Sequence, residues 1–452
     1  MSRLHSVRLN EDKCVGCTNC IKRCPTQAIR VRQGKARIAE TRCIDCGECI
    51  KACPHHAKSA EMDSLSQIKD FKYTIAVAAP SLYAQFGTPA TRLMVLAALR
   101  NLGFDDVYEA ALGAEIVTKA TAEYMATARR NHKLPLISSA CPAVVRVIQE
   151  KYPSLLDNLV PFDSPMEVTA SIARQEAMVK TGLESSEIGI FFISPCAAKR
   201  TAVTNPIGGR PTAIDAVVSF AEAYPQILSK LEHLETVQVE DFEKRMLADA
   251  YGVRWGYTGG EAVGLQIEKY LAVDGILNVV GILEEVENER LRDIDFIEAN
   301  SCMGGCIGGP LTVANRYSAK SRLNRYVREA ELFEREHPDL VYKADSIEID
   351  PWPNAPEANN ALSLDTDIIK ALAKYDQMEK ITQDLPGLDC GACGAPDCAA
   401  LAEDIVRGLA TETDCIFKLK ERIRSVVSQM SALESELNRH AIPGNSEPHE
   451  NP

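Results

Sequence analysis

Short apolar runs separated by amphipathic stretches dominate the middle of the chain. The runs are YTIAVA (73–78), LPLISSA (134–140), IGIFFISP (188–195) and IDFIEANS (294–301). They favour buried strands, and polar residues or prolines end most of them, whereas the longer stretches between them have helical periodicity. The pattern predicts an α/β core over residues 63–320.

The segments that follow this core have a different pattern. Residues 321–385 are charged and favour helix up to DPWPNAPEANN (350–360), whose prolines interrupt it. We therefore expect a helical and loop connection there, and a small domain ending in a helix over 386–440. The tail 441–452, AIPGNSEPHENP, is expected to be disordered.

Apolar residues recur in steps of three and four along the last predicted helix. The stripe consists of Ile416, Leu419, Ile423, Val426, Met430, Leu433 and Leu437. This spacing is typical of a coiled coil of about three heptads and predicts a homodimer. The alternative is that the stripe packs on the protein's own surface.

Length and charge exclude several classes of protein. The 452 residues suggest several domains, and 50 basic against 63 acidic residues give a net charge of -13. Such a chain does not attract phosphate backbones, so no nucleic-acid partner is expected. No run of 18 apolar residues occurs, and MSRLHSVRLNEDK lacks the apolar core of a signal peptide. We expect neither a membrane span nor secretion, and predict a cytoplasmic location.

The 16 cysteines lie mostly in tight groups, which indicates metal binding in a reducing compartment rather than a disulfide scaffold. The first eight form two copies of C-x2-C-x2-C-x3-C-P, a spacing that gives three ligands to one [4Fe-4S] cluster and the fourth to the other. Zinc knuckles, the alternative, rarely have three cysteines at successive gaps of two. The segment 1–62 resembles a bacterial two-cluster ferredoxin, an α+β electron relay. Cluster one is assigned to Cys14, Cys17, Cys20 and Cys53, and cluster two to Cys43, Cys46, Cys49 and Cys24.

The last four cysteines form a different kind of site. A glycine-rich loop supplies three of them, and the fourth follows a helix-like stretch. A third [4Fe-4S] cluster is the interpretation, with zinc as the alternative that spacing alone leaves open. The ligands are Cys390, Cys393, Cys398 and Cys415.

Four cysteines remain, and no local loop holds them together. Cys141, Cys196 and Cys302 each follow a predicted buried strand, and Cys306 lies four residues further on. Loops at the carboxyl ends of parallel strands gather where ligands bind. One buried site can therefore collect all four thiols.

Three segments resemble the signature motifs of [FeFe]-hydrogenases: SSACP (138–142), SPCAAK (194–199) and EANSCMGGCIGGP (298–310). The resemblance covers residues 73–310. It implies an H-cluster, in which a cubane on these four cysteines is bridged by Cys306 to a diiron unit with CO, cyanide and azadithiolate. It also implies that Lys199 donates to a cyanide. The further cofactor contacts it implies are Ala79, Pro80, Ser81, Ala140, Ser194, Pro195, Asn300 and Gly305.

The departures from the family pattern concern protons. Ala140 stands where catalytic members have a cysteine that relays protons, and a methyl group relays none. Ser194 and Asn300 replace methionines, one glycine before Pro310 is missing, and the usual acidic pair is absent around GAEIVTK (113–119). This combination resembles the sensory branch of the family that carries a C-terminal four-cysteine domain.

Any turnover still needs a proton carrier. Glu261 is the first candidate, because WGYTGGEAVG (255–264) resembles a family segment beside the H-cluster; Glu298 is the second. The alternative for both is a structural carboxylate at a helix end or in a surface salt bridge.

The expected activity is reversible cleavage of H2 into two protons and two electrons, at low turnover, in a hydrogen sensor. The alternatives are a catalytic hydrogenase with a non-standard proton path, and a non-enzymatic iron–sulfur scaffold resembling cluster-assembly proteins. Expected partners are a redox protein or ferredoxin, hydrogenase maturation proteins, a signalling partner and a second copy of the chain. No nucleotide-binding fingerprint occurs, so direct reduction of a nicotinamide is not expected.

Overall fold

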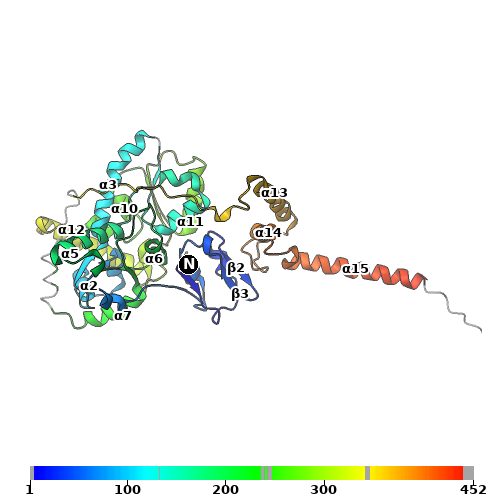
Figure 1. Cartoon of the computed structure of the whole chain (residues 1–452), viewed down its shortest axis with the longest axis horizontal. Helices are drawn as coiled ribbons and strands as arrows, with labels where there is room; N and C mark the ends of the chain where they lie inside the picture. The colour runs from blue at the N-terminus through cyan, green and yellow to red at the C-terminus, as the bar shows by residue number, and fades with distance from the viewer. Residues whose placement is uncertain are drawn as a thin grey trace, which may run out of the picture.

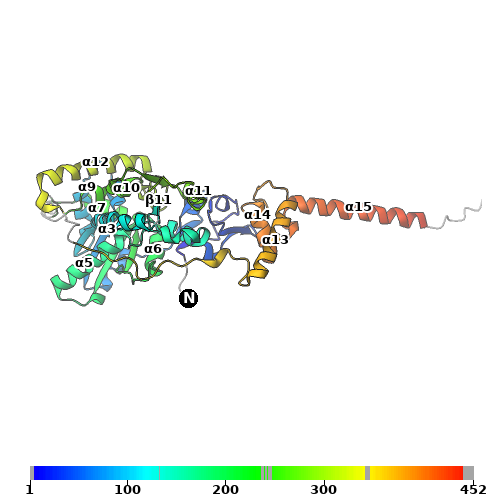
Figure 2. The ribbon, with the colours of Figure 1, turned by 90° about the horizontal axis from the view of Figure 1, so that it is seen from above.

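Three parts follow one another along the long axis of the molecule (Figures 1 and 2). The computed structural model describes residues 5–131, 133–235, 239, 242, 247–341 and 347–440. An α/β body lies at one end, the N-terminal part lies in the middle, and a small cysteine domain with one protruding helix lies at the other end. The tail 441–452, for which disorder was predicted, falls outside the described residues.

The N-terminal part has the predicted α+β character. Strand β1 (Val7–Leu9) pairs antiparallel with β4 (Lys58–Ala60), and β2 (Ile29–Arg32) pairs antiparallel with β3 (Lys35–Ile38). The cysteine groups lie between these ribbons, next to the short helix α1 (Glu48–Ala52).

The first sheet of the body is parallel and fully buried. Its order is β6-β5-β8-β9, and β5 and β8 are the predicted runs YTIAVA and IGIFFIS. Both faces of such a sheet meet helices, which is why its central strands β5 and β8 are almost continuously apolar. The strands are β5 (Tyr73–Ala78), β6 (Asp106–Glu109), β8 (Ile188–Ser194) and β9 (Ala216–Ser219). Helices of this region are α2 (Arg92–Arg100), α3 (Ala110–Arg130), α5 (Pro165–Thr181) and α7 (Phe220–Leu231).

A second parallel sheet of order β10-β11-β7 lies beside the first. Its strands are β7 (Leu136–Ile137), β10 (Tyr270–Asp274) and β11 (Phe296–Asn300). The other helices of the body are α4 (Pro142–Lys151), α6 (Ala197–Thr204), α9 (Ala250–Arg254), α10 (Gly260–Gly264) and α11 (Ile276–Glu287). The predicted strand runs thus belong to two sheets with separate apolar cores.

The segment 321–385, expected to be a helical and loop connection, begins within a helix that packs on the body. Helix α12 (Arg316–Glu336) buries Leu323, Tyr326 and Val327 in the main core. The Tyr326 hydroxyl also donates to the Ala90 carbonyl at 2.9 Å. The charged residues of α12 lie on its outer face. The composition of the segment therefore did not reveal the apolar face that is buried.

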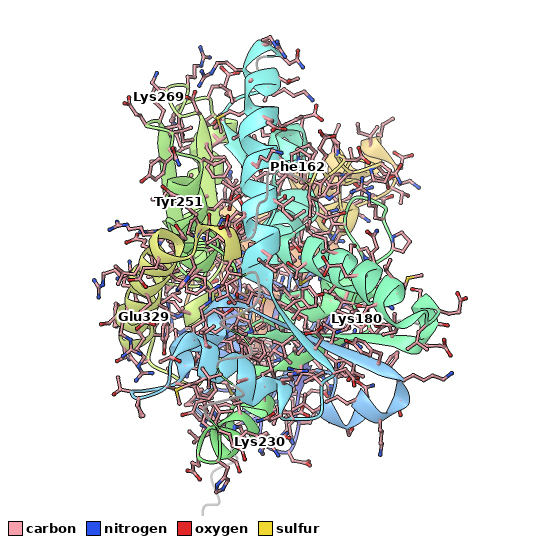
Figure 3. All side chains as sticks on the ribbon, turned by 90° about the vertical axis from the view of Figure 1, so that its left-hand side faces the viewer. Phe162, Lys180, Lys230, Tyr251, Lys269 and Glu329 are labelled. Atoms are coloured by element: carbon pink, nitrogen blue, oxygen red, sulfur yellow. The ribbon has the colours of Figure 1, made fainter. Side chains whose placement is uncertain are left out.

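Charged side chains cover the end of the body far from the N-terminal part. Lys180, Lys230, Lys269 and Glu329 point outward on this face (Figure 3). Within the described residues, no helix is long and apolar enough to cross a membrane.

The C-terminal part packs on the N-terminal part. It contains α13 (Ile368–Asp384), α14 (Cys398–Val406) and α15 (Ile416–His440). The backbone N–H of Val31 on β2 donates to the Gly394 carbonyl at 2.8 Å, and Arg30 pairs with Asp404 on α14 at 2.7 Å. Short 3₁₀ turns join the elements of the chain: η1 (Ile21–Arg23), η2 (Glu40–Arg42), η3 (Leu65–Asp70), η4 (Pro80–Gln85), η5 (Pro153–Asn158), η6 (Ser185–Glu187), η7 (Cys306–Gly308), η8 (Pro338–Leu340), η10 (Asn360–Leu362) and η11 (Glu412–Asp414).

Candidate metal centre

Four cysteines from three separate segments line one cavity in the body. Cys141 is the N-cap of α4 after β7, and Cys196 is the N-cap of α6 after β8. Cys302 follows β11, and Cys306 opens η7. The cavity therefore lies where the carboxyl ends of two sheets meet, and both sheets supply ligands.

The four thiols are close enough to affect one another. Burial raises the pKa of Cys196, and the neighbouring Cys302 and Cys141 raise it further. Burial likewise raises the pKa of Cys302 to about 11, although Lys51 acts against it. Thiolates gathered away from water need a metal cation to compensate their charge. This donor set fits an iron–sulfur cubane.

The opposite part of the cavity carries two polar groups suited to an anionic ligand. The Ser81 hydroxyl is fully buried and has no hydrogen-bond partner among the described residues. Leaving such a group unpaired costs about 1–3 kcal/mol, so an acceptor in the cavity would stabilise it. Lys199, in the first turn of α6, also lines the cavity; its Nζ lies 5.3 Å from the centroid of the Phe192 ring. Within the part of the chain that is described, no carboxylate forms a salt bridge with Lys199.

Most of the other residues predicted to contact the cofactor also lie at the cavity. They are Ala79, Pro80, Ala140, Pro195, Asn300 and Gly305. Ser194 supports a ligand loop instead: it is buried, and its Oγ accepts from the N–H of Cys196 at 3.1 Å.

Gly305 allows two backbone segments to approach each other. Its φ is +80°, and a Cβ there would lie 2.6 Å from the backbone nitrogen of Thr258. A side chain at this position would clash with the turn before α10 or push Cys306 away from the other three ligands.

Glu261 and Glu298 both line the cavity and are nearly fully buried, so neither is a surface salt-bridge residue. The Glu298 carboxylate accepts from the backbone nitrogens of Gly259 at 2.8 Å and Ala262 at 2.9 Å. Burial raises the pKa of Glu261 well above its ordinary value, and the charge of Glu298 raises it further. Burial also raises the pKa of Glu298, but the donors around its carboxylate act against this rise, so Glu261 is the more easily protonated member of the pair.

The sequence prediction did not give Ser138 a role of its own. Its hydroxyl donates to Glu261 at 2.5 Å and accepts from the backbone N–H of Ala140 at 3.3 Å. It thus connects the acid pair to the loop that carries Cys141. The available signal was its place in the first signature segment, but its partner is 123 residues away in sequence.

The cysteines of the second repeat lie near Cys24 of the first, which is the grouping predicted for cluster two. Cys24, from the first repeat, affects the pKa of Cys46 together with Cys49 and Cys43, and burial raises that pKa well above its usual value. The second repeat also lies against the segment 298–310, which carries Cys302 and Cys306. A Cβ on Gly47 would lie 2.5 Å from Pro310 at the end of that segment. The cysteines predicted to bind cluster two therefore lie in the repeat that contacts the body.

The last four cysteines come together in the C-terminal part. Cys393, Cys398 and Cys415 belong to one apolar cluster, and Cys390 lies at the surface. The Arg32 side chain donates to the carbonyl of Cys393 at 2.8 Å. This group therefore sits directly against the two-cluster part.

A buried four-thiol cavity at the ends of two parallel sheets, beside a ferredoxin-like unit, defines an iron–sulfur redox protein with a metal-binding α/β core. Three family models match the chain. They are "Iron only hydrogenase large subunit, C-terminal domain" (residues 72–266 and 261–310), "4Fe-4S dicluster domain" (6–54) and "Putative Fe-S cluster" (385–417). The chain belongs to the iron-only, or [FeFe], hydrogenase family, which confirms the resemblance and the predicted fold class.

Curated relatives differ in how much of them the chain covers. The periplasmic [Fe] hydrogenase large subunit of Nitratidesulfovibrio vulgaris is 30% identical over 366 residues, which are 68% of this chain and 86% of that protein. Iron hydrogenase 1 of Clostridium pasteurianum is 26% identical over 53% of this chain and 50% of its own length. The NADP-reducing hydrogenase subunit HndD of Solidesulfovibrio fructosivorans is 24% identical, and 49% of it is covered. The chain thus spans about half the length of these last two relatives.

Among solved structures, a variant of the [FeFe]-hydrogenase of Chlamydomonas reinhardtii aligns with a TM-score of 0.45 and 15% identity, over 61% of this chain and 92% of that chain.

Proposed function

We propose that this protein binds H2 and cleaves it reversibly into two protons and two electrons at an H-cluster, with low turnover, as a hydrogen sensor. The observation that carries the proposal is the cavity where four thiols face Lys199 and the unpaired Ser81 hydroxyl. Ala140, next to Cys141, lines the same cavity and offers no proton-carrying group.

The residues of the cavity have distinct tasks in this proposal. Cys141, Cys196, Cys302 and Cys306 would hold the cubane, with Cys306 bridging to the diiron unit. Lys199 and Ser81 would donate to its anionic ligands, because an ammonium and an unpaired hydroxyl both need acceptors. When bound, the cofactor supplies the site at which H2 is split. The protein supplies burial, orientation and the routes for protons and electrons.

Proton exchange would pass through the buried acid pair. Glu261 faces the cavity and has the more strongly raised pKa, while three donors, including Asn300 at 2.9 Å, favour the charged form of Glu298. Without a thiol at Ala140, the proton has to reach Glu261 across a longer gap. Slow proton transfer is the physical reason for low turnover.

Electron exchange would follow the order of the parts along the molecule. Cluster two would lie beside the body, and the C-terminal cluster would lie against β2, because Gly394 and Cys393 accept hydrogen bonds from Val31 and Arg32. A ferredoxin or another redox protein would accept electrons from this chain of clusters, and the C-terminal cluster offers a second outlet. Maturation proteins would have to deliver the diiron unit, and a signalling partner would read the redox state.

Two other functions remain distinct candidates. A catalytic hydrogenase with a non-standard path is favoured by Glu261 and Glu298 at the cavity. A non-enzymatic iron–sulfur scaffold would need only the thiols, and it would not explain why Lys199 and the unpaired Ser81 hydroxyl line the cavity.

Infrared spectroscopy of the anaerobically reconstituted protein, loaded with the diiron cofactor, tests the proposal. CO and cyanide bands that change under H2, together with slow H2 oxidation, are expected. Fast turnover would instead establish a catalytic hydrogenase. Absence of the bands in protein with a full complement of cubanes would leave the scaffold.

The substitution Ala140→Cys tests whether the missing proton-carrying thiol is what keeps turnover low. A restored thiol should raise the rate of H2 oxidation, by less than the roughly 10²-fold that a complete acid–base relay contributes. The infrared bands should stay unchanged. Ala140→Ser is the matched control of similar size. Unchanged turnover in Ala140→Cys would show that protons do not limit the rate.

A further inference from the structure

Helix α15 (Ile416–His440) protrudes from the C-terminal part, and along most of its length none of the described residues lies beside it (Figures 1 and 2). Its 25 residues span about 37 Å at 1.5 Å per residue. Lys418 anchors its first turn through a salt bridge to Asp384 at 2.8 Å. The apolar stripe does not pack on the part of the chain that the structure describes, because its members, from Ile416 to Leu437, are 40% to 73% exposed.

The stripe has the geometry of a coiled-coil interface. In heptad terms, Ile416, Ile423, Met430 and Leu437 occupy a positions, and Leu419, Val426 and Leu433 occupy d positions. An isolated helix with such a stripe exposes a continuous apolar surface to water, which marks an interaction site. What remains to be identified is the occupant.

The charges beside the stripe indicate which partner helix binds there. The flanking e and g positions are basic in the first half of the helix and acidic in the second half, with neutral residues between them. In chain order these residues are Lys420, Arg422, Val427, Gln429, Glu434 and Glu436.

We propose that α15 pairs with α15 of a second copy of this chain, in antiparallel orientation. The register that aligns Val426 with Met430 of the second copy also aligns Ile423 with Leu433 and Leu419 with Leu437. Each of these a–d layers occurs twice, once on either side of the twofold axis. The stripe is therefore complementary to itself over nearly its whole length.

In the same register every flanking charge meets its opposite. Lys420 faces Glu434 of the second copy, and Arg422 faces Glu436, and both pairs occur twice. Val427 and Gln429 meet their own copies near the axis. A parallel dimer would instead place the basic halves together and the acidic halves together, and its g–e contacts would pair Arg422 with Val427. Charge complementarity thus favours the antiparallel arrangement and a second copy over an unrelated helix.

The orientation determines where the metal sites go. Antiparallel helices place the two C-terminal cysteine groups at opposite ends of the shared coiled coil, separated by about the 37 Å length of the helix. Each copy then keeps its own chain of clusters, and the dimer serves assembly rather than electron exchange between C-terminal clusters.

Sedimentation equilibrium of the full-length protein under anaerobic conditions tests the proposal. The protein should sediment at twice the mass of one chain. The double variant Lys420→Glu with Arg422→Glu should raise the dimer Kd at least about 10-fold, because four attractive pairs become repulsive. Adding Glu434→Lys and Glu436→Lys should restore the dimer.

The matched control is Arg424→Glu with Ser428→Glu, on the helix face away from the stripe, which should dimerise like the unmodified protein. Unchanged iron content in all variants verifies that the body is folded. A monomeric unmodified protein would overturn the proposal and leave the stripe to another protein. A dimer that survives the double variant would overturn the antiparallel register.

Discussion

Lys199 occupies a position that few lysines have, since its ammonium lines a buried cavity over the face of Phe192 rather than facing water. Such a cation needs either a carboxylate or an anionic ligand. The nearby thiols, which burial and mutual repulsion disfavour as thiolates, need a metal. Both the cation and the thiols therefore fit the anionic metal cofactor that we propose for the cavity.

Replacing Lys199 tests this at the residue scale. Lys199→Met keeps the length of the side chain and removes the donor, so it should lower the amount of diiron unit retained by about 10- to 100-fold. The cubane iron content should stay the same. Infrared band intensity per protein and iron analysis give the two readouts.

Lys180→Met on the outer face of α5 is the control, because Lys180 is exposed and interacts with Tyr73 and Asp106. Full retention of the diiron bands in Lys199→Met would contradict the assignment of Lys199 to the cofactor.

The acid pair gives a second prediction. Glu261→Gln removes the member whose pKa is the more strongly raised and should lower H2 oxidation by about 10²-fold, since positioned acid–base groups contribute about 10²–10⁴-fold. Glu298→Gln should have a smaller effect on proton transfer, because Glu298 is held by backbone donors. If neither substitution lowers the rate, protons leave by another route.

At the scale of elements, α14 and β2 determine how the C-terminal cluster is held. Arg42, just before Cys43, forms a salt bridge with Glu403 on α14, and Arg30 and Arg32 both contact Asp404. Burial acts to raise the pKa of Glu403, but the Arg42 and Arg407 guanidinium groups lower it below its ordinary value. At pH values above the ordinary pKa of a glutamate, these ion pairs therefore stabilise the docking of the C-terminal part on the N-terminal part. This stabilisation is lost as the pH falls through the lowered pKa of Glu403.

We expect Glu403→Gln to weaken docking by about 3 kcal/mol, because it leaves the buried Arg42 without its carboxylate. Hydrogen exchange of the Val31 amide, which donates to Gly394, should then accelerate. The control is Glu11→Gln, which removes the exposed Arg37–Glu11 pair of the same part and should leave the Val31 amide unchanged. Equal protection of Val31 in Glu403→Gln would show that the ion pairs do not hold the C-terminal part.

At the scale of the whole molecule, Asp45 joins the two-cluster part to the body. This fully buried carboxylate lies between Cys43 and Cys46, and it accepts from the backbone of Ser6 and from Thr201 on α6 at 2.6 Å. It also pairs with Arg146 on α4 at 3.4 Å. Helices α4 and α6 begin directly after Cys141 and Cys196, so one carboxylate positions the ligand loops of both metal sites.

Asp45→Asn should lower the free energy of unfolding by about 3 kcal/mol, because it leaves Arg146 buried without its charged partner. We also expect slower reduction of an external electron acceptor by H2, with the CO and cyanide bands retained, since the cofactor cavity itself is not altered. Asp12→Asn, at an exposed position of the same part, is the control and should change neither quantity. Loss of the infrared bands together with electron transfer would mean that Asp45 supports the cavity rather than the connection.

Features encoded in short windows of sequence were predictable. Cysteine spacing predicted three ligands of each N-terminal cluster, because thiols separated by two residues can reach one metal cluster regardless of the rest of the fold. The apolar runs gave strands β5, β7, β8 and β11, and the heptad steps gave α15, because both periodicities are properties of local backbone geometry.

The tertiary structure alone decided how these pieces meet. It distributed the strands over two sheets, so that the cavity lies between them, and it placed α12 in the core by its buried face. It also brought Glu261 to Ser138, Asp45 to Thr201 and Glu403 to Arg42, pairs that are 123, 156 and 361 residues apart in sequence. Such contacts depend on which surfaces pack together in the folded protein. A local pattern of residues therefore cannot predict a partner that is more than a hundred positions away in sequence.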